Sequence, residues 1–150
     1  MTEHEMVEQV LAHMPYANAM GITIETVAPD ALICALPYSE SHIGNAQLPA
    51  LHGGALAGFM EIAATLEVAR RQLALQDNVH GTDFATLGES LPVPVNVTVQ
   101  YLRSVATKDC HVRAEILKLG RRSNTVLCRM WQDDETKPVA SMIGIFVRPA

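Results

Sequence analysis

The sequence has few cysteines, no metal-binding spacing and no long apolar run, and each scarcity excludes a class of protein. Its three cysteines are far apart and lie among apolar residues, which is typical of reduced core thiols rather than of a disulfide framework. No HxxxH or CxxC spacing occurs, so we predict no metal site. Gly, Pro or charged residues interrupt every apolar stretch well before about 18 residues, so we predict no membrane span.

Positive charge is also scarce, with 11 Lys and Arg against 16 Asp and Glu and a formal net charge of −5. This balance argues against a nucleic-acid partner. Residues 1–5 are acidic and lack the basic start of a signal peptide, so we expect a cytoplasmic protein. The 150 residues, 49% of them hydrophobic, suit one globular domain over 1–150, in which residues 1–20 form an N-terminal helical extension.

Hydrophobic periodicity predicts an α+β fold. Apolar positions at helical spacing predict a short helix over 3–13, ended by Pro15, and a long apolar helix over 54–75 whose end, Arg70 to Gln72, is solvated. Alternation over 21–38 predicts a strand pair or one long bent strand, and 39–50 reads as a loop. The role of the connection 76–91, with Phe84 and Leu87, stays open between a pocket wall and a mobile link. Strand-like runs with short joins follow at 93–103, 110–119, 124–132 and 138–147.

These elements predict a long central helix wrapped by a curved antiparallel sheet of five to six strands, with a short N-terminal helix. The long helix carries the most informative motif. Residues 51–55 (LHGGA) open it, and a Gly-Gly pair there exposes backbone N–H groups where the helix dipole favours a carbonyl oxygen that gains negative charge. Glu61 lies inside the helix between Met60 and Ile62, where burying a carboxylate is costly without a function. This pair of features predicts acyl-transfer hydrolysis.

The motifs together resemble a known family. His52-Gly53-Gly54, Glu61 nine positions after the histidine, VTVQYLR at 97–103 and KLGR at 118–121 resemble the hotdog-fold acyl-CoA thioesterases, and most of all their phenylacetic-acid-degradation (PaaI-like) branch. The resemblance covers about residues 20–148. It implies a hotdog fold, hydrolysis of an acyl-CoA thioester to free acid and CoA, no cofactor beyond the CoA of the substrate, and a homodimer with active sites between subunits.

The resemblance also implies roles for single residues. Glu61 would be the catalytic carboxylate, acting as general base or as nucleophile. The Gly53 backbone N–H would polarise the thioester carbonyl with help from Gly54, and His52 and Thr65 would orient the substrate or the water. Two departures stand out: many members of the branch carry Asp where this chain has Glu, and the amide expected six residues before the histidine is replaced by an alanine. Which neighbouring amide, Asn45 or Gln47, faces the substrate stays open.

Reach favours the implied dimer. At about 1.5 Å per residue, Glu61 lies roughly 12 Å along the helix from the Gly53 amide, farther than a glutamate side chain extends. Two antiparallel helices related by a two-fold axis place Glu61 of one protomer beside Gly53 of the other. A further pairing of dimers into a tetramer stays open.

Three cations near turns, Arg103, Arg121 and Arg122, are candidates to hold the phosphates of CoA. Two other functions remain as alternatives. A hydroxyacyl-thioester dehydratase or hydratase would need the order His, Pro-Gly, then the helix acid. Leu48-Pro49 is weakly similar to that pattern, but no histidine stands between Ile43 and Leu51. A non-catalytic acyl-CoA-binding protein would not need Glu61 beside the HGG motif.

Overall fold

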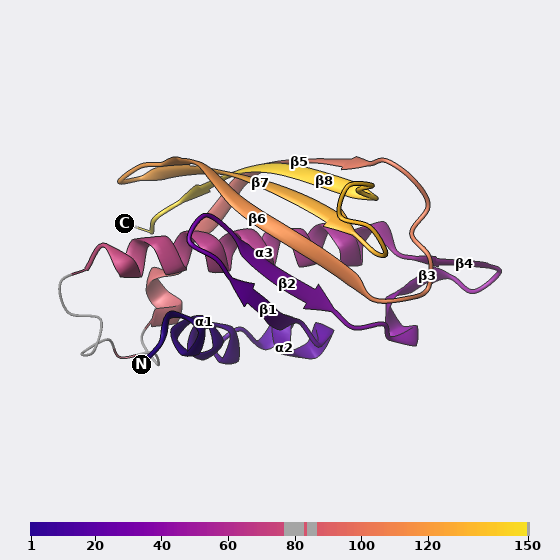
Figure 1. Cartoon of the computed structure of the whole chain (residues 1–150), viewed down its shortest axis with the longest axis horizontal. Coiled ribbons are helices and arrows are strands. Elements are labelled where there is room, and N and C mark those ends of the chain that lie inside the picture. The colour runs from indigo at the N-terminus through magenta and orange to yellow at the C-terminus, as the bar shows by residue number, and fades with distance from the viewer. Residues whose placement is uncertain (77–82, 84–86, 150) are drawn as a thin grey trace.

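The computed structural model describes residues 1–76, 83 and 87–149. Its main feature is a fully antiparallel six-stranded sheet with the strand order β1-β2-β6-β7-β8-β5. The helix α3 lies along one face of this sheet and contacts five of its strands (Figure 1). The bounds are β1 Thr23–Val27, β2 Leu32–Leu36, β5 Val93–Tyr101, β6 Cys110–Leu119, β7 Ser123–Trp131, β8 Ala140–Val147 and α3 Gly53–Ala74. The predicted α+β architecture, with its central helix and curved antiparallel sheet, is confirmed.

The core forms because α3 is apolar around most of its circumference and the sheet strands alternate. From Ile62 to Arg70 every residue of α3 is buried. Small side chains such as Ala63 and Ala64 let the sheet approach the helix closely. The sheet contributes the inward-facing members of each strand, among them Leu32, Cys34, Val112, Ala114, Val126, Cys128, Met130, Met142 and Phe146.

The N-terminal segment forms two helices, where one was predicted. The first, α1 (Glu3–Ala12), is capped by Thr2, whose side chain accepts the Glu5 N–H. Pro15 does not only follow this helix: it occupies the first turn of a second one, α2 (Pro15–Met20), where its missing N–H costs nothing. Gly21, in the left-handed conformation at φ 81°, ends α2. Both helices lie on the side of α3 away from β5 and β8 (Figure 1).

The strand pair predicted over 21–38 is confirmed as β1 and β2, but the loop predicted over 39–50 is wrong in part. It contains a 3-10 turn, η1 (Glu40–His42), and a hairpin of β3 (Ile43–Asn45) and β4 (Leu48–Leu51). The Asn45 side chain accepts the Gln47 N–H at 2.9 Å and closes the hairpin turn. This hairpin projects from the end of the molecule where α3 begins (Figure 1).

Within the connection 76–91 the structure describes Gln76, residue 83 and the segment from 87 onward, which includes η3 (Gly88–Ser90). Leu87 belongs to the hydrophobic core and also lines a small pocket with Leu73 and Leu91. Phe84, the other residue proposed to line an acyl pocket, lies outside the described residues. No helix in the described parts of the chain is long and apolar enough to cross a membrane.

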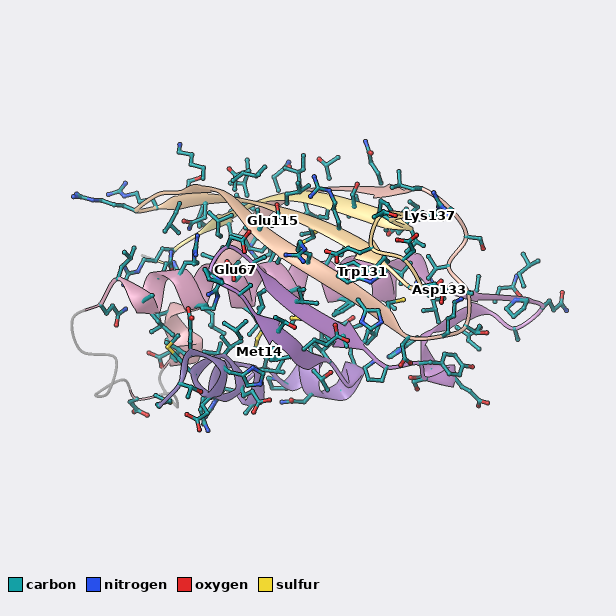
Figure 2. The ribbon with its side chains drawn as sticks, viewed as in Figure 1. Met14, Glu67, Glu115, Trp131, Asp133 and Lys137 are labelled. Carbon is teal, nitrogen blue, oxygen red and sulfur yellow. The ribbon has the colours of Figure 1, made fainter. Side chains whose placement is uncertain are left out.

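The solvated end predicted for the long helix is wrong at Arg70, which is 1% exposed. Its guanidinium donates two hydrogen bonds of 2.8 Å to the carboxylate of Glu67, which is 0% exposed, and one of 2.7 Å to Glu3. Figure 2 shows Glu67 among the ribbons at the middle of the molecule. Burial raises the pKa of Glu67, and the hydrogen bonds and charge of Arg70 act in the opposite direction. The bond from Arg70 to Glu3 joins α3 to α1, and the buried Glu67 carboxylate holds the Arg70 guanidinium in place.

Candidate active site

The first turn of α3 presents one free backbone amide, that of Gly53. His52 is the N-cap residue: its Nδ1 accepts the Gly54 N–H at 2.8 Å, and its carbonyl accepts the N–H groups of Ala55 and Leu56. The Gly53 N–H donates to no residue in the described part of the chain. The expectation that both glycine amides are free is therefore wrong for Gly54, whose N–H the neighbouring imidazole satisfies. The bond to Nδ1 also fixes the His52 tautomer with its proton on Nε2.

Tyr101 of β5 covers the same helix end, and the sequence motif alone did not give it this role. Its hydroxyl donates to the Gly53 carbonyl at 2.8 Å. A Cβ on Gly53 would lie 3.2 Å from the ring of Tyr101, which is closer than most side chains approach a Cβ. Glycine at this position therefore permits the contact. The contact holds the helix N-terminus against the edge strand of the sheet.

Glu61 and Thr65 share one face of α3, one turn apart. Thr65 is buried, and its hydroxyl donates to the backbone carbonyl of Glu61 at 3.0 Å. Glu61 itself is half-buried, and its carboxylate has no hydrogen bond or ion pair with any residue that the structure describes. The fully buried carboxylate of this helix is instead Glu67. The Glu61 carboxylate oxygens thus lie on a partly exposed face of the helix and have no partner among the described residues, as a general base or a nucleophile requires.

The two candidate amides lie at the tip of the β3–β4 hairpin. Asn45 and Gln47 are both exposed, and the Asn45 Oδ1 is occupied by the hairpin turn. The Gln47 side chain makes no hydrogen bond within the described residues. The structure thus leaves the Gln47 amide freer to meet a ligand than the Asn45 oxygen.

His42, just before the hairpin, is a site residue that sequence reasoning missed. Its carbonyl accepts the His52 N–H at 2.7 Å and so helps to hold the N-cap in place. Its side chain is buried, and its Nδ1 has no hydrogen-bond partner in the described structure. No sequence spacing marked it, because the contact joins residues on the two sides of a hairpin.

The three candidate arginines occupy opposite ends of α3. Arg103 follows Tyr101 by two residues and so lies at the Gly53 end. Arg121 and Arg122 lie in the β6–β7 turn, where Arg121 lines a pocket of about 460 Å³ with Gln72 and residues 75–76 from the end of α3. A helix of 22 residues is about 33 Å long. One protomer therefore does not bring Arg121 or Arg122 to Gly53.

The edge strand β5 has the features of a strand that can pair with another. It has no neighbour on its outer side among the described strands, and its nine residues, VPVNVTVQY, carry no charge. Several of its apolar side chains face solvent, above all Val95, which is 60% exposed. Pro94 and the irregular register between Pro94 and Asn96 interrupt one end of this edge, but the rest of the long, uncharged strand is a template for another strand.

Comparison with known proteins agrees with this geometry. The family described as acyl-CoA thioesterase N-terminal domain matches residues 43–147, which include the HGG motif, Glu61 and the strands β5 to β8. The chain belongs to this family. Comparison with curated proteins gives no significant match.

Solved structures share the fold over nearly the whole chain. A conserved protein from Pseudomonas aeruginosa is 26% identical, with a TM-score of 0.71 over 95% of this chain and 98% of that one. A thioesterase from Haemophilus influenzae is 17% identical, with a TM-score of 0.75 over 95% of this chain and 87% of that one. A Shewanella oneidensis protein related to the thioesterase superfamily is 19% identical, with a TM-score of 0.79 over 98% and 97%. The predicted hotdog fold is confirmed.

Proposed function

We propose that this protein hydrolyses an acyl-CoA thioester to the free acid and CoA at a site shared by two protomers. The observation that carries the proposal is that one helix presents both a backbone N–H and a carboxylate without hydrogen-bond partners among the described residues. The Gly53 N–H is the free donor of the first turn of α3, and the Glu61 carboxylate is free on the open face of the same helix. The family of the chain supports the same reaction.

In the proposed reaction, the thioester oxygen accepts the Gly53 N–H, at the positive end of the helix dipole. Glu61 as general base takes a proton from water, and the oxygen of that water attacks the carbonyl carbon. The Gly53 N–H stabilises the oxyanion of the tetrahedral intermediate. When the intermediate collapses, the C–S bond breaks, and the CoA thiolate takes up the proton.

The alternative role of Glu61 is nucleophilic. Its carboxylate would attack the thioester carbon, displace CoA and form a mixed anhydride that water then cleaves. A burst of CoA released ahead of the free acid in rapid-mixing experiments would favour this route. Simultaneous release of CoA and acid would favour the general base.

The shared site follows from reach and from the free edge of the sheet. Glu61 is roughly 12 Å along α3 from the Gly53 amide, so one protomer cannot apply both groups to one carbonyl. If β5 pairs antiparallel with β5 of a second copy, the Tyr101 end of one strand lies opposite the Val93 end of the other. This pairing sets the two α3 helices side by side and brings Glu61 of one toward Gly53 of the other.

The same pairing explains how distant arginines could serve one substrate. Val93 is the register partner of Val147, and the next residue, Arg148, donates its backbone N–H to the Arg122 carbonyl. The Val93 end therefore carries the β6–β7 turn. In the proposed dimer, the partner subunit's Arg121 and the partner subunit's Arg122 approach the end where Arg103 lies, and all three can contact CoA phosphates.

His52, Thr65 and the hairpin amides complete the proposal. Because the His52 Nδ1 caps the helix, the Nε2–H on the other side of the ring can donate a hydrogen bond to the substrate. Thr65 donates to the Glu61 carbonyl but keeps its oxygen lone pairs, which can accept a hydrogen bond from the attacking water. Gln47 is our choice for the amide that contacts substrate. The PaaI-like branch and a cytoplasmic location remain predictions.

The decisive test is Glu61→Gln, because it keeps the size of the side chain and removes its charge. We expect kcat to fall about 10²- to 10⁴-fold with little change in KM, measured as free CoA released from acyl-CoA. The matched control is Glu115→Gln, which alters a partly buried glutamate on β6 and should leave kcat within about twofold. Hydrolysis by Glu61→Gln at the rate of the unaltered protein would reject the assignment. Binding of acyl-CoA without hydrolysis by the unaltered protein would favour a non-catalytic binding protein.

A further inference from the structure

Tyr16 of α2 lies against the open face of α3 on the side opposite Tyr101. Its hydroxyl is 3.1 Å, and its Cε1 3.3 Å, from the position that a Cβ on Gly58 would occupy. The side chain is nevertheless 60% exposed, and its hydroxyl makes no hydrogen bond within the described residues. A large aromatic side chain held on the surface in this way contributes little to the core.

Gly58 and Glu61 are three residues apart on α3 and therefore neighbours on its surface. The Tyr16 ring thus stands within about one helical turn of the proposed catalytic carboxylate. Gly54, Gly58 and Glu61 form one strip along the helix surface. The His52 ring packs beside Gly54 and the Tyr16 ring beside Gly58, and Tyr101 lies against Gly53 at the β5 side. The two tyrosines come from elements that are far apart in the sequence and are joined only by the fold.

We propose that Tyr16 forms the wall of the acyl pocket and sets which acyl groups the enzyme accepts, an inference that rests on the proposed function. The charge distribution separates the acyl end from the CoA end. The arginines that can hold phosphates lie on the β5 side, at Arg103 and in the partner's β6–β7 turn. The helix α2 (PYANAM) has no charged residue. An uncharged wall with an aromatic ring suits an acyl chain and does not suit a phosphate.

Gly58 makes this placement possible. A Cβ there would sit closer to Tyr16 than side chains normally approach, so Gly58→Ala must displace the ring by a few tenths of an ångström or more. Alanine is at the same time the better helix former. A change in substrate preference caused by Gly58→Ala therefore cannot come from a weakened helix, which makes this variant a useful second probe of Tyr16.

The experiment compares kcat/KM for acetyl-CoA, hexanoyl-CoA and phenylacetyl-CoA in four variants: Tyr16→Ala, Tyr16→Phe, Gly58→Ala and Tyr38→Ala. We expect Tyr16→Ala to lower kcat/KM about 10-fold for the two larger substrates and to leave acetyl-CoA within about twofold. Gly58→Ala should shift the same ratio in the same direction by a smaller factor. Tyr16→Phe keeps the ring and should keep the preference. Tyr38→Ala removes another exposed tyrosine, outside the strip, and should change nothing.

An equal change of all three substrates in Tyr16→Ala, or an unchanged ratio, would overturn the role of Tyr16 and leave the proposed function intact. If the unaltered protein releases CoA from none of the three, the proposed function fails instead. In that case, dissociation constants for non-hydrolysable thioether analogues of the same three compounds test Tyr16 separately. A selective loss of affinity for the two larger analogues in Tyr16→Ala would support the pocket wall, and equal affinities would reject it.

Discussion

At the scale of single residues, His52 shapes the candidate site because its Nδ1 accepts one backbone N–H of the helix end. The HGG motif supplies two glycine amides, and the imidazole takes the Gly54 amide at 2.8 Å. In the proposed reaction, the Gly53 amide, whose own carbonyl accepts the Tyr101 hydroxyl, is therefore the donor left for the oxyanion. A single available N–H fixes the position of a carbonyl oxygen better than several exposed amides would, because the oxygen has one place to bind.

The three cysteines provide a residue-scale prediction. Burial raises the pKa of Cys34 and Cys128 far above the ordinary range and that of Cys110 to about 11. Thiolate, the reactive form, is therefore almost absent at neutral pH. We expect Ellman's reagent to label no thiol of the native protein within minutes at pH 7.5 and all three after unfolding. Rapid labelling of even one native thiol would contradict the buried placement, and it would also interfere with a free-thiol assay of CoA release.

The sequence placed the motif residues on the right element because they are local: the HGG motif begins α3 and Glu61 lies within it. It failed where burial depends on a distant partner. Glu61 sits among apolar neighbours in sequence but is half-buried, whereas Glu67 is the carboxylate that the fold encloses. The difference comes from Arg70 and from the arrival of Glu3 on α1, which is 67 positions away from Arg70. Helical periodicity contains no information about that contact.

At the scale of elements, Arg70 links α3 to α1, because it pairs with Glu3 of α1 and with Glu67 on its own helix. Arg70→Met should lower the free energy of unfolding by about 3–5 kcal/mol, because the buried Glu67 carboxylate loses both hydrogen bonds and keeps only Arg71, at 3.8 Å, as an ion-pair partner. Denaturant titration measures the loss. Arg113→Met is the matched control, since it removes an arginine–glutamate pair at the surface and should cost about 0–1 kcal/mol. The double variant Glu67→Met with Arg70→Met should recover most of the stability.

The sign of the pH dependence makes this prediction sharper. Burial already raises the pKa of Glu67, and removal of Arg70 raises it further, so in Arg70→Met the folded state holds the Glu67 proton where the unfolded chain has lost it. Stability then falls as pH rises from the ordinary glutamate range, near 4.5, through the raised folded pKa. We expect the deficit of Arg70→Met to be smaller at pH 4.5 than at pH 7. A constant deficit would show that Glu67 does not carry the effect.

Elements with strong periodicity were predictable, and short ones were not. The helix α3 and the strands β5 to β8 have enough residues for the pattern to be legible. The helix α2 has six residues, and β3 has three, so no period can be read in either. Their positions come from capping and turn contacts: the proline at the start of α2, Gly21 at its end and the Asn45 turn of the hairpin. The helix α2 and the strand β3 both flank the candidate site, so the surroundings of the site were harder to predict from the sequence than the motif residues.

At the scale of the whole molecule, the proposed site needs two copies of the chain, and a variant that blocks dimer formation tests this directly. Val95→Lys places a charge on the exposed edge of β5 and should block pairing of β5 with a second β5. We expect this variant to sediment as a monomer and to lose activity although Glu61, Gly53 and His52 are unchanged, and to regain activity as its concentration rises. Leu117→Lys adds the same charge at an exposed leucine on β6, an interior strand, and should leave the dimer and its activity in place. Full activity in a verified Val95→Lys monomer would mean that one protomer brings an acid and an oxyanion donor to the same thioester, and the shared site would have to be abandoned.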